Sequence, residues 1–378
     1  MSRARVRSVF AAAAVAMVLG WPAAMAAEPE AAGRPSEGGA AAATEIKKRA
    51  CTVAFDWLAH HQMPDGSWSL EKYTARCKDK TCRGTASIQA DAAATAFGLL
   101  PFLAAGQTHK TDGPYRANIA AAIDWLTKRQ EADGNLAKGG RTGTTMYSHA
   151  LATIALCEAY GLSRDKEIGA AAQKAIEFIE KAQHKKTGGW RYNPGETGDT
   201  SVLGWQVSAL RSAQLAGLKV SAACLEGARK FLASVATGEH GAQFLYAPFA
   251  RATLATTAAG LLSSRHLGAS RDDPRMIAGA DYLMTHLPDA RSRNCYYWFY
   301  ATQFLHSQGG MQWDTWYRAL RATLLATQVR DGTCAAGSWD PGKPLSDAWG
   351  IQGGRLMVTS LSTLTLEVYY RYLPLFKE

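Results

Sequence analysis

The sequence predicts an all-α protein, an (α/α)6 toroid in which six outer helices surround six inner helices. Two observations carry this prediction. A Gln-x-x-Asp-Gly motif recurs along the chain, and helix-period segments alternate between amphipathic and wholly apolar forms. No stretch has the alternating β-branched pattern of a strand. Of the 378 residues, 47% are hydrophobic, which is enough for a large core and excludes a disordered chain.

The N-terminus has the parts of a secretory signal peptide. Three arginines precede an almost purely apolar run at 10–19, and Ala24-Met25-Ala26 is a small-x-small cleavage site. The apolar run is shorter than the ~20 residues that a membrane-spanning helix needs. We therefore expect a signal peptide at residues 1–26 and an exported protein, periplasmic or secreted.

The rest of the chain divides into a tether and one large domain. Residues 27–44 are rich in Ala, Gly and Pro, which predicts a flexible linker with little to bury. Residues 45–378 are expected to form the toroid domain.

The net charge of +10 does not indicate a nucleic-acid partner. Charged residues are only 20% of the chain, and the basic ones are spread over several repeats without aromatic residues between them. We expect at most peripheral contact with an anionic membrane or glycan surface.

The recurring motif marks the ends of the outer helices. It reads Gln62-Met-Pro-Asp65-Gly66-Ser-Trp68 in its first copy and recurs at 130–136 and 328–332, with a fourth copy lacking Asp at 183–190. Each copy follows a segment with apolar residues at helical spacing. Glycine after such a segment accepts the left-handed conformation that ends a helix.

The segments after the motifs are expected to be the inner helices, because they are apolar nearly all round. They are residues 90–105, 146–160, 202–218 and 357–372. Two weaker pairs complete the set: outer 224–235 with inner 244–262, and outer 276–287 with inner 296–306. Six pairs of about 56 residues suit a helical repeat, and wholly apolar inner helices favour a closed ring over an open array.

The motif resembles the glutamine–tryptophan repeat of squalene and oxidosqualene cyclases and of protein prenyltransferase β-subunits. The segment from Gly189 to Gln206 also resembles an exported bacterial cyclase-like branch of undefined activity. In that family the repeat side chains clip neighbouring outer helices together. The resemblance therefore implies a structural role for Gln62, Trp68, Gln130, Gln183, Trp190, Gln328 and Trp339.

The resemblance does not extend to the cyclase proton donor. Class II cyclases use the middle Asp of Asp-x-Asp-Asp-Thr-Ala, and the matching segment here is Asp91-Ala-Ala93-Ala-Thr95-Ala96. Ala93 stands at the donor position and cannot supply a proton. Paired carboxylates at 271–274 lie beside Arg and Pro before an outer helix, which is typical of a solvated cap.

A prenyltransferase zinc site is not expected either. Asp331 and Cys334 are spaced one residue wider than in the family, and the helix from Arg355 to Ser360 begins without His. We expect no cofactor and no metal. Whether the chain is an enzyme stays open, because neither family chemistry is intact.

The seven cysteines follow a signal peptide, so disulfides are allowed. Cys77 and Cys82 are expected to form a local disulfide, with a metal site as the second choice, since no His lies close in sequence and His60-His61 lacks metal-ligand spacing. Cys295 and Cys334 are a further candidate pair. Cys157 and Cys224 have the spacing of small core residues.

The candidate site lies where the inner helices begin. The candidate catalytic residues are Asp199, His149 and Asp91, with Asp199 and His149 as the preferred acid–base pair. The candidate cavity-lining residues are Tyr147, Trp205, Tyr246, Tyr297 and Tyr300. Each also has a structural interpretation: the two aspartates as helix caps, the histidine and the aromatic residues as core.

Three functions remain open at this point. The first is binding of an apolar, isoprenoid-type ligand, or of a protein segment, in the ring without class II cyclase chemistry. The second is an enzyme that uses a non-family acid in the same cavity. The third is a polysaccharide-active enzyme, disfavoured because the inner helices offer few carboxylates.

Overall fold

The computed structural model describes residues 37–137 and 143–368, so the predicted signal peptide lies outside the described residues. The chain separates into two units, Met1–Ala42 and Ala43–Glu378, and the second contains the helical ring. The described residues form twelve α-helices and two short strands, which confirms the predicted fold class.

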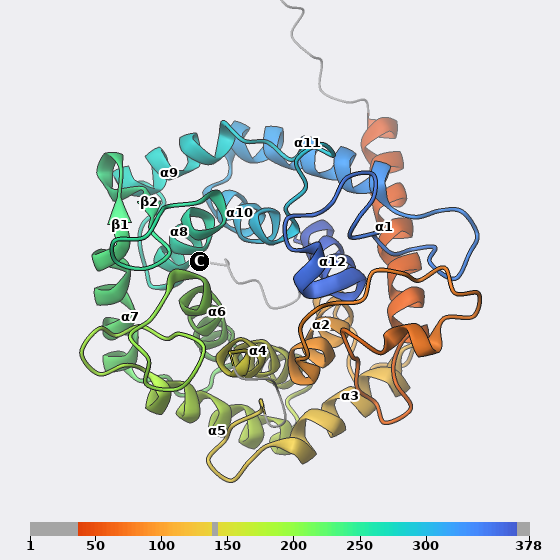
Figure 1. Ribbon diagram of the computed structural model, residues 1–378, viewed down its shortest axis with the longest axis horizontal. Helices are drawn as coiled ribbons and strands as arrows, with labels where there is room; N and C mark the ends of the chain where they lie inside the picture. Colours follow the sequence, from red (N-terminus) through yellow and green to blue (C-terminus); the bar gives the residue numbers. More distant parts are fainter. Residues whose placement is uncertain (1–36, 138–142, 369–378) are drawn as a thin grey trace, which may run out of the picture. The chain divides into compact units, whose positions relative to one another are not determined.

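The helices alternate along the chain between two concentric layers (Figure 1). The outer layer consists of α1 (Glu37–His60), α3 (Arg116–Arg129), α5 (Lys166–Ala182), α7 (Ala222–Val235), α9 (Pro274–Met284) and α11 (Gly310–Thr327). The inner layer consists of α2 (Asp91–Ala104), α4 (Thr145–Ser163), α6 (Thr200–Ala216), α8 (Leu254–His266), α10 (Cys295–Gln308) and α12 (Gly350–Leu366). Each inner helix packs on the next, and α12 packs on α2, which closes the ring.

Burial follows the sequence pattern. All residues of α2 except Asp91 are buried, whereas α5 buries only one face. Among the described helices, none has both the length and the apolar character needed to cross a bilayer.

Several predicted boundaries differ from the structure, and the inner helix expected at 357–372 is α12, from Gly350 to Leu366. The inner helix expected from residue 244 begins at Leu254, because Gln243–Phe244 forms strand β2, which pairs antiparallel with β1 (Ala236–Thr237). Thr253 then caps α8 by accepting a hydrogen bond from the Thr256 amide. Helix α1 begins at Glu37, inside the range expected to be linker.

The repeat glutamines connect each outer helix to the following one. The Gln62 side-chain amide donates to the Gly66 carbonyl of its own loop and to the Asn118 carbonyl at the start of α3. The same double contact recurs at the other copies: Gln130 with Gly134 and Ala171, Gln183 with Gly188 and Cys224, and Gln328 with Gly337 and Ala50. The last copy joins α11 to α1 and so bridges the two ends of the ring.

The repeat tryptophans fix each loop to the helix before it. The indole N–H groups of Trp68, Trp190 and Trp339 donate to carbonyls of the preceding outer helix, those of Leu58, Ile179 and Leu324. The Trp68 ring also lies against α2 so closely that a Cβ on Gly98 would be 2.2 Å from it. Both contacts serve the scaffold, which sets the positions of the inner helices.

Candidate functional site

The lumen of the ring is filled by aromatic side chains near the starts of the inner helices. Trp205 of α6 stacks on Phe299 of α10, with ring centroids 5.3 Å apart, and meets Phe97 of α2 edge-on at 6.3 Å. Tyr300 of α10 also contacts Trp205. Because α2, α6 and α10 are alternate members of the inner ring, these contacts cross the lumen. We call Phe97, Trp205, Phe299 and Tyr300 the aromatic plug.

The plug leaves little free surface at this level. Trp205 is 2% exposed, and Phe97 and Phe299 are each 5% exposed. The plug therefore closes the lumen to a long ligand unless its aromatic side chains move. Two of the expected lining residues, Trp205 and Tyr300, are packed inside the plug in this conformation.

Four tyrosines form a half-buried rim beside the plug. They are Tyr147, Tyr192, Tyr246 and Tyr296, and we call them the tyrosine rim. The rings of Tyr147 and Tyr192 are 6.1 Å apart, the hydroxyls of Tyr192 and Tyr246 are hydrogen-bonded, and Tyr296 contacts both Trp205 and Tyr300. The sequence predicts Tyr147 and Tyr246 as lining residues, and the structure adds Tyr192 and Tyr296 to them.

Asp199 is the N-cap residue of α6, and this position places it at the centre of the tyrosine rim. Its Oδ1 accepts hydrogen bonds from the Val202 amide at 2.9 Å and from the Ser201 hydroxyl at 2.6 Å. The Tyr147 hydroxyl is 2.6 Å from that serine oxygen. A proton-sharing chain therefore runs from the half-buried tyrosine through Ser201 to the buried carboxylate.

The second oxygen of Asp199 lies beside Arg191 and Tyr246. Oδ2 is buried, accepts no hydrogen bond within the described part of the chain, and lies 3.9 Å from Arg191 Nε. Burial raises the pKa of the Asp199 carboxyl, and the hydrogen bonds from Ser201 and Val202 oppose that rise. Arg191 also stands over the Tyr192 ring at 5.3 Å. A buried acid, a cation and aromatic faces therefore meet at one point.

His149 does not join this group, so the expected acid–base pair with Asp199 is wrong. Its Nδ1 accepts a hydrogen bond from the Leu136 amide at 3.1 Å, and its Nε2 donates to the Ala175 carbonyl of α5 at 3.0 Å. Both ring nitrogens are satisfied by the outer layer. Burial lowers the pKa of His149 to about 4, so the ring stays neutral.

Two further candidates lie away from the rim. Tyr297 donates its hydroxyl to the Leu283 and His286 carbonyls of the outer layer, so its expected place in the cavity is wrong. Asp91 is in the first turn of α2 and half-exposed, and Ala93 is buried and without an acid.

The predicted cysteine pairs are also wrong, because all seven cysteines are free. Cys295 Sγ contacts Asp347 Oδ1 at 3.3 Å in place of a second sulfur. Cys77, Cys82 and Cys334 converge instead on His61, a grouping that the sequence spacing does not indicate. Cys157 and Cys224 are buried.

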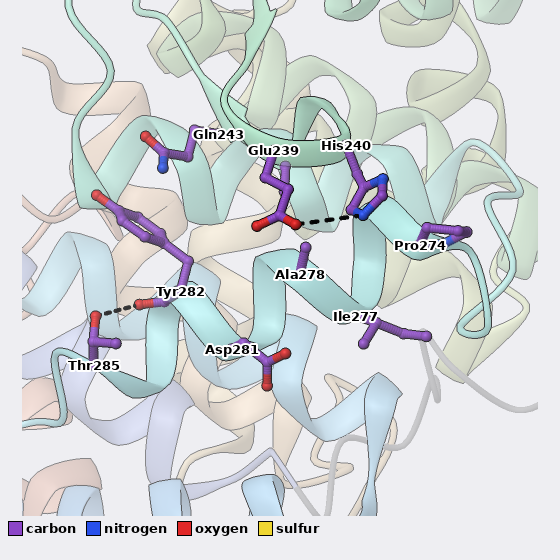
Figure 2. A pocket seen from close by; sticks show the side chains of 10 residues that line it. Glu239, His240, Gln243, Pro274, Ile277, Ala278, Asp281, Tyr282 and Thr285 are labelled. Atoms are coloured by element: carbon purple, nitrogen blue, oxygen red, sulfur yellow. Dashed lines mark hydrogen bonds and ion pairs between the residues drawn. The ribbon is translucent and has the colours of Figure 1, made fainter. Parts of the chain in front are cut away.

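A separate pocket lies on the outer layer, between α9 and the short helix η2 (Glu239–Gly241) (Figure 2). Glu239 and His240 are both exposed on one side of it, with His240 Nε2 3.7 Å from Glu239 Oε1, and the exposed Ile277 lines the opposite side. It has no buried acid comparable to Asp199. The tyrosine rim is therefore the stronger candidate site.

Comparisons with known proteins agree with this architecture. The model of the squalene-hopene cyclase C-terminal domain matches residues 37–150. No curated protein sequence matches the chain.

Several solved structures share the fold at low identity. A variant of the type II terpene cyclase MstE from Scytonema, solved with geranylgeranyl dihydroxybenzoate, has a TM-score of 0.56 and 11% identity, over 88% of this chain and 99% of that one. The cellobiose 2-epimerase of Spirochaeta thermophila has a TM-score of 0.62 and 14% identity, over 87% and 96%. An α-1,6-mannanase from Salegentibacter has a TM-score of 0.57 and 11% identity, over 86% and 98%. With its glutamine–tryptophan clips and closed double ring, the protein has the (α/α)6 toroid fold, and its first repeats, residues 37–150, are similar to the squalene-hopene cyclase C-terminal domain.

Proposed function

We propose that the protein is an exported binding toroid that holds an apolar, isoprenoid-type ligand at the tyrosine rim and does not perform class II cyclase chemistry. The observation that carries this proposal is the meeting of half-buried aromatic faces with the buried Asp199, whose Oδ2 accepts no hydrogen bond within 3.5 Å in the described part of the chain. Aromatic faces hold apolar ligands, and a few convergent polar groups fix their orientation.

The chemistry of the rim favours a ligand with one polar end. Asp199 accepts, Arg191 donates, and the Tyr147 hydroxyl can do either. A hydroxyl or a small polar head group near Asp199 Oδ2, with its apolar body against Tyr296 and Trp205, satisfies all of these groups. The MstE complex shows that this fold accommodates an isoprenoid with a polar aromatic head in another protein.

Two features support the proposed lack of cyclase chemistry. Ala93 replaces the donor acid, and the aromatic plug occupies the lumen in which a long polyene would have to fold. A short or partly inserted ligand fits the rim better than a fully enclosed one.

A second candidate function is favoured by Asp199 alone. A carboxyl whose pKa is raised by burial keeps its proton longer and can act as a general acid. Tyr147 and Ser201 would return the proton from solvent. In this case the rim would turn over its ligand instead of only binding it.

The test is extraction and mass spectrometry of the full chain purified from its own host. We expect to find an apolar compound at close to one molecule per chain. The control variant Tyr282→Phe, on the outer surface, should retain this compound, whereas Asp199→Asn and Tyr147→Phe should bind less of it or none. Extracts without any such compound at that sensitivity would contradict the binding proposal. Hopene-like products after incubation with squalene would contradict the absence of cyclase chemistry.

The same variants separate the two functions. If Asp199 only binds, Asp199→Asn leaves the identity of the bound compound unchanged. If Asp199 is an acid, Asp199→Asn traps a substrate that the unmodified protein converts, and the two extracts contain different compounds.

A further inference from the structure

Four potential metal ligands converge where the first and last repeats meet. His61 follows α1, Cys77 and Cys82 lie in the loop between α1 and α2, and Cys334 lies in the loop between α11 and α12. One ligand atom from each residue lies within 4.8 Å of all the others. His61 and Cys82 are buried, and Cys77 and Cys334 are partly exposed, so a metal ion can reach the group.

The histidine is already oriented as a ligand. His61 Nδ1 is 2.7 Å from the Trp57 carbonyl, so this nitrogen carries the proton and donates it. Nε2 therefore holds a free lone pair, and it lies 3.9 Å from Cys334 Sγ. In a tetrahedral zinc site, neighbouring nitrogen and sulfur ligands are about 3.5 to 3.8 Å apart.

Backbone amides point at two of the sulfurs. The Cys82 amide donates to Cys77 Sγ at 3.3 Å, and the Lys78 amide donates to Cys334 Sγ at 3.4 Å. Such N–H donors stabilise the thiolate form that a metal requires. A disulfide between any two of the sulfurs, by contrast, would leave the third thiol and the imidazole without a function.

Asp79 holds the two loops in register around the cluster. Its Oδ2 accepts a hydrogen bond from the Cys334 amide at 2.8 Å, and its Oδ1 accepts from the Thr81 hydroxyl at 2.6 Å. Cys77 Sγ lies 3.5 Å from the same Oδ1 and donates there as a thiol. The backbone and hydroxyl contacts of Asp79 thus set the loop conformation without using the ligand atoms.

We propose that Cys77, Cys82, Cys334 and His61 bind one Zn²⁺ ion in a closed structural site that ties the first repeat to the last. Three thiolates and an imidazole are a soft ligand set that suits zinc. Each thiol releases its proton to solvent as the metal binds. Four protein ligands leave no open position for a substrate, so the ion stabilises the ring and takes no part in chemistry.

This set differs from the prenyltransferase zinc site, whose ligands the sequence does not preserve. Only Cys334 is common to both, and Asp331 instead accepts hydrogen bonds from its neighbour Thr333. The proposed ion lies among outer-layer loops and is independent of the ligand proposed for the tyrosine rim.

The test is the metal content of the full chain, purified without chelator after growth in zinc-supplemented medium. We expect about one Zn²⁺ per chain by elemental mass spectrometry. Exchange for Co²⁺ should give visible bands of a tetrahedral ion and an ultraviolet thiolate charge-transfer band. Reduced protein that binds neither Zn²⁺ nor Co²⁺ would overturn the proposal, as would a disulfide involving Cys77, Cys82 or Cys334 in protein isolated from the host envelope without reductant.

Variants identify the ligands. His61→Ala and Cys82→Ser should lower the metal content by at least about tenfold. Cys224→Ser, a buried cysteine on α7 outside the cluster, should leave it unchanged.

His61→Cys covers the case in which the other variants fail to fold. It keeps four ligands, so it should bind Co²⁺ with a stronger thiolate band than the unmodified protein. An unchanged spectrum would show that His61 is not a ligand and would overturn the proposed set.

Discussion

Gln328 is the glutamine that joins the last outer helix to the first, and Gln328→Ala tests how much this clip stabilises the ring. Its amide donates to the Ala50 carbonyl at 2.8 Å and to the Gly337 carbonyl at 2.9 Å, and the side chain is buried. Removing it leaves the Gly337 carbonyl unpaired and takes one hydrogen bond from the Ala50 carbonyl, which keeps its bond within α1. At about 1 to 3 kcal/mol for the unpaired carbonyl and about 0.5 to 1.5 kcal/mol for the other lost bond, the expected loss is roughly 1.5 to 4.5 kcal/mol of unfolding free energy.

The assay is urea unfolding followed by circular dichroism, with the midpoint and the slope compared between variants. Gln173→Ala is the matched control, because its amide donates to the Lys219 carbonyl in an exposed position. We expect the control to change stability by less than about 0.5 kcal/mol. A loss below about 1 kcal/mol for Gln328→Ala, with an unchanged slope, would refute the reasoning.

Three further variants test the packing and the charges. Gly98→Ala should cost about 1 to 3 kcal/mol in urea unfolding, because the new Cβ would meet the Trp68 ring at 2.2 Å; an unchanged midpoint would contradict this close approach. Trp205→Ala should cost about 3 to 5 kcal/mol by emptying the centre of the plug, whereas a loss below about 1 kcal/mol would mean that the lumen refills. The pKa of Asp165 is lowered to about 2, and the largest cause is its hydrogen bond with Lys110. The ionised Asp165 therefore stabilises the fold at pH values above its unfolded pKa of about 3.9, and this contribution is lost as the pH falls towards 2. Asp165→Asn should therefore be less stable than the unmodified protein at pH 7 and equal to it near pH 2, and a difference that does not change with pH would argue against this origin.

The sequence is sufficient for the fold because its signals are local. The Gln-x-x-Asp-Gly motif ends outer helices, and a helix that is apolar all round, such as α2, has to be internal. The predicted start of α8 is wrong because burial alone does not distinguish a helix from a strand. Phe244 is buried and apolar, but it belongs to strand β2, which packs against α8.

The site is only partly predictable from the sequence. The position of a residue along an inner helix gives its depth in the ring, but it does not say whether the side chain points into the lumen or toward the outer layer. His149 and Asp199 both lie near helix starts, yet His149 points outward to Ala175 and Asp199 inward to the rim. Tyr297 and Tyr300 are less than one turn apart, and they face the outer layer and the lumen respectively. Rotation about the helix axis depends on tertiary packing, which periodicity in nearly uniform apolar segments does not encode.

The proposed zinc ligands cannot be found by spacing, since His61 and Cys334 are 273 residues apart. That separation is itself informative about how the ring is held closed. Every other pair of neighbouring repeats is joined by the chain, but the first and last are joined only by noncovalent contacts, among them the backbone hydrogen bonds from Arg355 to Gly84 and from Ser87 to Ile351. Besides Gln328, the buried Arg355 donates to the Arg83 carbonyl at 2.7 Å and pairs with Asp340.

A metal at this junction would act on one part of the molecule more than on the rest. Ligands so far apart in sequence come together only in the closed ring, so binding favours closure over any state in which the first and last repeats separate. Chelation should therefore lower hydrogen-exchange protection in α1, α11 and α12, while α6 and α8, on the opposite side of the ring, keep theirs (Figure 1). Equal loss of protection in all these helices would mean that the ring opens as one cooperative unit and that the junction is not its weakest point.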